Sequence, residues 1–193
     1  MNLPNRLTIL RVILVPFFLA VMLLPESVMP ENFSRVLAAI LFAVTALTDF
    51  IDGKIARKYN LVTNFGKFMD PLADKFMIIT ALLGATARYD YLRDVLVWIT
   101  LIVVFRELAI TSLRLIASST AGKVIAAAWV GKIKTAAQCF CILAILLEPV
   151  ILPFAVFQKF HILTWASVAV MTFFTIYSGI QYFIAYKEFL SQD

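Results

Sequence analysis

Four aspartates stand close together between two apolar segments of this sequence, at positions 49, 52, 70 and 74. Asp49 and Asp52 are three residues apart, and Asp70 and Asp74 are four apart, so each pair shares one face of a helix. Two helices joined by a short connection are antiparallel neighbours. We therefore expect the four carboxylates to form one cluster.

A cluster of carboxylates in apolar surroundings needs compensating positive charge. Each aspartate at the centre of a bilayer costs about 2.5–3.5 kcal/mol, and neighbouring carboxylates repel one another. Two divalent cations would balance the charge, and oxygen ligands favour Mg²⁺ or Mn²⁺ over Zn²⁺. The alternative is a structural network of salt bridges with Arg57, Lys58 and Lys75. We favour the metal site because all four aspartates have helical spacing, with glycines between them.

The composition indicates where this cluster lies. Of the 193 residues, 62% are hydrophobic, and the mean hydropathy is +0.92, whereas only about half of a soluble globular protein is apolar. The net charge is +5 and the pI about 9.3. Basic residues gathered between apolar spans are typical of cytoplasmic membrane faces, so no nucleic-acid partner is expected. The sequence predicts an integral membrane protein with a single domain over residues 1–193.

Six apolar segments are long enough to cross a hydrocarbon core of about 30 Å, which takes roughly 20 helical residues. They lie near residues 7–24, 35–58, 68–87, 92–117, 130–147 and 161–186. None alternates with period 2, so we predict an all-α protein with six transmembrane helices and not a barrel. The first segment lacks a small-residue cleavage site and is expected to be retained.

The distribution of lysine and arginine predicts the orientation. The connection at 54–67 holds Lys54, Arg57, Lys58 and Lys67, and the connection at 119–134 holds three lysines, whereas those near 25–34 and 148–160 are poor in both residue types. Cytoplasmic loops carry the excess of positive charge. Both termini and the aspartate cluster are therefore expected on the cytoplasmic side of the plasma membrane.

The aspartates belong to a longer pattern. The spacing D-x2-D-G-x2-A-R-x8-G-x3-D-x3-D is filled by Asp49, Asp52, Gly53, Ala56, Arg57, Gly66, Asp70 and Asp74. This resembles the signature of the CDP-alcohol phosphatidyltransferase family, and every fixed position matches. The resemblance implies a six-helix membrane enzyme, usually a homodimer, that transfers a phosphatidyl group from CDP-diacylglycerol to an alcohol and releases CMP.

The family pattern also implies roles for the motif residues. The four aspartates bind two divalent ions, and Asp74 is the base that takes the proton of the attacking hydroxyl. The motif glycines and their neighbours contact CDP-diacylglycerol, which implies Gly53, Ala56, Arg57 and Gly66 at this site. Taken alone, Gly53 is explained by close helix packing and Gly66 by a turn.

Polar residues outside the motif predict a pocket for a phosphorylated alcohol. Thr8 and Arg11 are separated by a helical step of three, and Lys134 shares a helix face with Gln138. We expect Thr8, Arg11, Arg114 and Lys134 to bind the acceptor phosphate.

Two further basic residues, Arg106 and Lys132, are not predicted to bind the acceptor. Arg106 is eight residues before Arg114, about 80° away around a helix, so the two face broadly one way. The neighbouring Glu107 points about 100° away from Arg106, so we expect Arg106 to pair with an acid on another helix. Lys132 is expected to reach towards the membrane interface.

Three segments resemble the branch of the family whose acceptor is sn-glycerol 3-phosphate. They are NLPNRLTILR, RE with the following SLR, and WVGKIKTAAQ. Inositol phosphate, serine and phosphatidylglycerol stay open as acceptors. Inositol phosphate would also need a basic pocket, so charge alone does not separate it from glycerol 3-phosphate. A cation transporter or channel is the alternative of another class, but it predicts acids at several depths of the bilayer. The four aspartates of this chain are instead expected near one face of the membrane. A third alternative, a non-catalytic membrane scaffold, would leave the energetic cost of burying these carboxylates unexplained.

Overall fold

The computed structural model describes residues 2–59, 63–121 and 129–190, and within these ranges all side chains except those of 49, 50, 52–58, 67, 118–121 and 188–190. In this part of the chain every element is helical. The helices are α1 (Leu3–Leu23), α2 (Glu31–Lys58), α3 (Asn64–Arg88), α4 (Asp90–Ala121), α5 (Trp129–Ile151), α6 (Ala155–Phe160) and α7 (Ile162–Leu190). The predicted all-α fold is confirmed.

Each of the six predicted apolar segments forms one long helix, although several ends differ from the prediction. Helix α1 begins earlier than expected, because the Asn2 side chain caps it by accepting a hydrogen bond from the Asn5 backbone N–H at 3.2 Å. Helix α5 includes Lys134, which the sequence had placed in the preceding connection. Helix α6 was not predicted. It is a short helix without buried residues that ends at His161 in a left-handed conformation, φ 46°.

Five helices in the described part of the chain are long and apolar enough to cross a membrane, namely α1, α2, α4, α5 and α7. Helix α3 is not among them, because Asp70, Asp74 and Lys75 add charge to its first half. It nevertheless has 25 residues, which extend about 37 Å at a rise of 1.5 Å per residue. A sixth span would therefore have to be α3.

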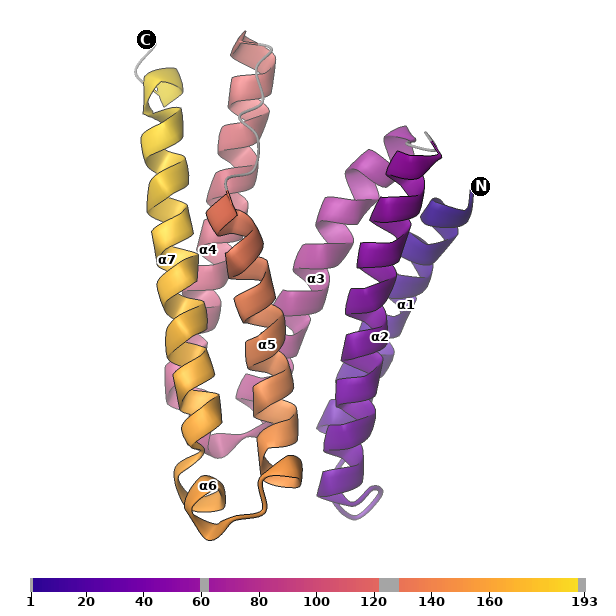
Figure 1. Ribbon diagram of the computed structural model, residues 1–193, viewed down its shortest axis with the longest axis vertical. Helices are drawn as coiled ribbons and strands as arrows, with labels where there is room; N and C mark the ends of the chain where they lie inside the picture. The colour runs from indigo at the N-terminus through magenta and orange to yellow at the C-terminus, as the bar shows by residue number, and fades with distance from the viewer. Residues whose placement is uncertain (1, 60–62, 122–128, 191–193) are drawn as a thin grey trace.

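The long helices form two groups that diverge towards the end at which both termini lie (Figure 1). One group is α1, α2 and α3, and the other is α4, α5 and α7. Helix α1 packs along both α2 and α3, whereas α2 and α3 scarcely touch each other in the described part. They are antiparallel, as expected, but α1 provides most of the contacts within this group.

The apolar core fills the half of the bundle opposite the termini. Phe18, Phe42, Leu82, Leu92 and Ile142 are fully buried there and come from five different helices. Side chains pack closely in this half, so the helices can separate only in the other half. That half carries the polar residues Lys75, Glu107, Lys134 and Ser178, which come from α3, α4, α5 and α7.

Candidate active site

Asp70 and Asp74 are the two motif carboxylates with described side chains, and both are half-buried on α3. The hydroxyl of Thr8 on α1 donates to Asp70 Oδ1 at 2.7 Å. Asp74, one turn further along α3, lines a cavity that α4, α5 and α7 also border. Helix α1 therefore orients the first carboxylate, while the second faces open space.

Helix α3 begins in close contact with α1. The hydroxyl of Thr63 accepts from the Gly66 backbone N–H at 3.0 Å and donates to Asn5 Oδ1 at 2.9 Å. A Cβ at Gly66 would lie 3.3 Å from Asn5 Oδ1 and 3.6 Å from Asp70 Oδ2. The glycine thus permits a close approach of two helices. Its predicted contact with CDP-diacylglycerol stays a prediction beside this packing role.

The first half of the motif lies on the last turns of α2. The backbone of Asp49, Asp52, Gly53, Ala56 and Arg57 is helical, as their spacing predicts. Their side chains lie outside the described part of the structure. The cluster of four carboxylates and the CDP-diacylglycerol contacts of this half therefore stay predictions.

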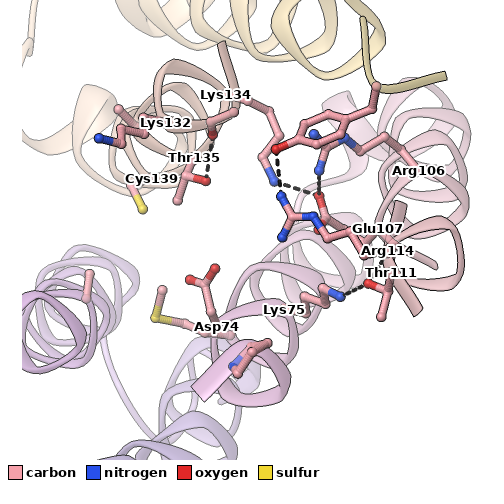
Figure 2. Close-up of a pocket in the computed structure, with 16 residues that line it drawn as sticks. Asp74, Lys75, Arg106, Glu107, Thr111, Arg114, Lys132, Lys134, Thr135 and Cys139 are labelled. Carbon is pink, nitrogen blue, oxygen red and sulfur yellow. Dashed lines mark hydrogen bonds and ion pairs between the residues drawn. The ribbon is translucent and has the colours of Figure 1, made fainter. Parts of the chain in front are cut away.

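A cavity of about 630 Å³ lies beside Asp74. Cations outnumber carboxylates on its wall, which carries Lys75, Arg106, Arg114, Lys132 and Lys134 with Asp74 and Glu107. Figure 2 shows the Asp74 carboxylate pointing into the space between α3 and the cations of α4 and α5. Such a wall attracts an anionic ligand and places it opposite a carboxylate.

Glu107 joins two cations on this wall. Its Oε1 accepts hydrogen bonds from Lys134 Nζ at 2.6 Å and from Arg106 Nη1 at 2.9 Å, and the three residues are only 6–8% exposed. The expectation that Arg106 pairs with an acid on another helix is wrong, because its long side chain bends back to the adjacent residue. Arg106 Nη2 also donates to Ser178 Oγ on α7 at 3.1 Å. Breaking a buried charge group like this one is costly, since it leaves an ion without its partner.

Arg114 is held by an aromatic residue of α7. Its Nη2 donates to the Tyr182 hydroxyl at 2.6 Å, and its guanidinium lies 5.1 Å from the centre of the Tyr182 ring. The guanidinium of Arg106 lies 5.5 Å from the same ring. Arg106 and Arg114 therefore point towards the same side of α4, as their spacing predicts. Tyr182 could not be predicted from the sequence, because nothing distinguishes it locally within an apolar helix.

Lys75 ties the motif helix to α4. Its ammonium donates to the Thr111 hydroxyl, which in turn donates to the backbone carbonyl of Glu107 at 2.7 Å. From the sequence, Lys75 is expected only as a counter-ion for the aspartates. Its position directly after Asp74 in the motif was the one available signal that it lies at the site.

The structure divides the four predicted acceptor-binding residues between two places. Arg114 and Lys134 line the cavity. Thr8 and Arg11 are buried on α1, at 1% and 0% exposure, and lie outside its described lining. Lys132 also borders the cavity, but it is exposed and its ammonium lies 5.5 Å from the Trp129 ring. Its expected position at the membrane interface stays a prediction.

The end of the motif fits a hard divalent cation. Asp70 and Asp74 present carboxylate oxygens from one face of α3, and such oxygens are the ligands that Mg²⁺ and Mn²⁺ prefer. Thr8 holds Asp70 through Oδ1, which leaves Oδ2 available as a ligand. A hydrogen bond that orients a ligating carboxylate is a common feature of metal sites.

The chain belongs to the CDP-alcohol phosphatidyltransferase family, whose sequence model matches residues 1–177. Members of this family are generally dependent on a divalent metal. A protein of Bacillus subtilis named CDP-diacylglycerol–glycerol-3-phosphate 3-phosphatidyltransferase is 40% identical over 192 residues, which cover 94% of this chain and 93% of its own length. An Escherichia coli protein of the same name is 38% identical over 152 residues, 77% of this chain and 78% of its own.

Proposed function

We propose that this chain transfers the phosphatidyl group of CDP-diacylglycerol to sn-glycerol 3-phosphate and releases CMP. The observation that carries the proposal is the cavity in which the motif residue Asp74 faces Arg114 and Lys134. An anionic acceptor explains why the wall opposite this carboxylate is cationic. The names of the relatives from Bacillus subtilis and Escherichia coli support the same acceptor.

Arg114 and Lys134 bind the acceptor phosphate. An ammonium group has three N–H donors, so Lys134 can bond to Glu107 and still donate to a phosphate. Tyr182 holds Arg114 in the same way that Glu107 holds Lys134. Side chains oriented before the ligand arrives lose less conformational freedom on binding, which favours affinity.

Asp74 accepts the proton of the attacking acceptor hydroxyl. The oxygen of that hydroxyl forms a bond to the phosphorus of the phosphatidyl group. The bond from this phosphorus to the CMP oxygen breaks, and CMP leaves with the bonding electrons. Because Asp74 lines the cavity that holds the phosphate-binding cations, a single bound acceptor can reach both the cations and the base.

The four motif aspartates, Asp49, Asp52, Asp70 and Asp74, hold two divalent ions, Mg²⁺ or Mn²⁺. When bound, these ions stabilise the negative charge that develops on the phosphate groups. Thr8 orients Asp70 for this role through their 2.7 Å hydrogen bond. The CDP-diacylglycerol contacts come from the motif residues Gly53, Ala56, Arg57 and Gly66.

Six helices, α1–α5 and α7, span the plasma membrane, and the active site faces the cytoplasm. Both termini, the end of α2 and the start of α3 lie at one end of the bundle (Figure 1). Lys54, Arg57 and Lys58 belong to the last turns of α2 at this end, which agrees with the bias of cytoplasmic loops towards positive charge. A homodimer is proposed from the family resemblance, and chemical cross-linking in membranes would test it.

An acceptor screen with purified protein, radiolabelled CDP-diacylglycerol and Mg²⁺ tests the proposed reaction. We expect labelled lipid product and CMP with sn-glycerol 3-phosphate, and neither with inositol phosphate, serine or phosphatidylglycerol. Product with another acceptor alone would refute the acceptor and keep the chemistry. Absence of CMP release with every acceptor would refute the enzymatic assignment.

A further inference from the structure

Gln138 carries a buried hydrogen-bond donor that the described structure does not satisfy. It lies on α5 one turn after Lys134, and its side chain is only 1% exposed. Its amide nitrogen Nε2 has no hydrogen-bond partner in the described part of the protein. Buried polar groups are nearly always paired, so an unpaired amide beside a ligand cavity requires an explanation.

Gln138 lines a second, much smaller cavity of about 10 Å³. Asp74, Lys75, Glu107 and Lys134 line both this cavity and the large one, so the two adjoin. Ile78 and Ile79 provide apolar lining on the side of α3. This volume is close to the smallest that can hold one water molecule, so it can take one hydroxyl group but no larger polar group.

The order of groups along glycerol 3-phosphate matches the order of residues along the site. In the acceptor, the reacting hydroxyl and the phosphate sit on the two end carbons, and a second hydroxyl sits on the carbon between them. In the protein, the small cavity is bordered by the proposed base Asp74 and by the phosphate-binding Lys134. A ligand that reaches both residues along the border shared by the two cavities brings its middle carbon close to the small one.

We propose that the small cavity receives the central, non-reacting hydroxyl of the acceptor and that Gln138 Nε2 donates a hydrogen bond to its oxygen. A hydroxyl is both donor and acceptor, and the carboxylate of Glu107 borders the same cavity to accept its proton in a hydrogen bond. Gln138 is then a specificity-determining residue. The inference rests on the proposed function, because it assumes glycerol 3-phosphate as the acceptor.

The test compares two acceptors that differ only in this hydroxyl, sn-glycerol 3-phosphate and 3-hydroxypropyl phosphate. We expect the wild-type protein to prefer the first by about 10- to 100-fold in kcat/KM, since the analogue leaves Gln138 unpaired. Gln138→Met keeps the length of the side chain and removes its donor. It should lower kcat/KM for glycerol 3-phosphate by a similar factor and leave the analogue nearly unchanged, so that the preference disappears.

Thr100→Val is the matched control. Like Gln138, Thr100 on α4 is buried, at 5% exposure, and its hydroxyl lacks a hydrogen-bond partner in the described structure. It lies outside the described lining of both cavities. This variant should keep the wild-type preference. Equal losses for both acceptors in Gln138→Met would overturn the inference and leave Gln138 with a structural role or a bound water. A wild-type protein that discriminates by less than about twofold would overturn it as well. A wild-type protein that uses neither acceptor would instead overturn the proposed function.

Discussion

Replacing Lys134 by methionine tests the acceptor pocket most directly. Lys134 is 6% exposed and its ammonium is held by Glu107 at 2.6 Å. A charge-assisted hydrogen bond to the acceptor phosphate contributes about 1.5–3 kcal/mol, which corresponds to a factor of about 10 to 150. We expect Lys134→Met to raise the KM for glycerol 3-phosphate by this factor. Glu107 keeps its contact with Arg106 in the variant, so the protein should still fold.

The assay measures KM for each substrate at a saturating concentration of the other. The KM for CDP-diacylglycerol should stay nearly constant, because Lys134 is proposed to contact only the acceptor. The control is Lys159→Met, since Lys159 on α6 is exposed and lies outside the described lining of the cavity. It should change neither KM by more than about threefold, as expected of a surface residue. Equal losses for both substrates, or an equal effect at Lys159, would refute the proposed pocket.

Asp70→Ala should abolish transfer while the protein still inserts into membranes. A chelator should abolish the activity of the wild-type enzyme until Mg²⁺ is restored. A fully active Asp70→Ala variant would contradict the metal assignment. Asp74→Asn should reduce kcat by about 10²–10⁴ at saturating Mg²⁺ and substrates, the usual contribution of a general base. Near-normal turnover under these conditions would exclude Asp74 as the base. Tyr182→Phe keeps the ring but removes the hydrogen bond to Arg114, so the KM for glycerol 3-phosphate should rise by about three- to tenfold, and an unchanged KM would show that Arg114 needs no support.

Much of this protein can be predicted from its sequence because the relevant signals are local. The length of an apolar segment decides whether a helix can cross a bilayer, and each predicted segment is one long helix. The step of four between Asp70 and Asp74 puts both on one face of α3 by helix geometry alone. Arg106 and Arg114 likewise face the same ring of Tyr182. The eight-position motif was enough to indicate the family that the comparison confirms.

Contacts between distant parts of the chain could not be predicted in this way. Arg114 and Tyr182 are 68 residues apart, and Glu107 and Lys134 are 27 apart. Such pairs depend on which helices pack together, and a helix with apolar residues on every side does not identify its neighbour. The error at Arg106 has a different cause. The angle between neighbouring residues around a helix does not account for how far a long side chain can bend towards the next residue.

The sequence by itself therefore determined the long apolar helices, the shared face of Asp70 and Asp74, and the family. Only the tertiary structure decided that α1 holds Asp70, that Arg114 and Lys134 share a cavity with Asp74 while Thr8 and Arg11 do not, and that Gln138 faces a cavity of hydroxyl size. The physical reason is the range of the interactions. The periodicity of a helix relates residues that are only a few positions apart in one segment. A cavity, in contrast, forms only where several helices that are distant in the sequence meet and their side chains do not fill the space between them.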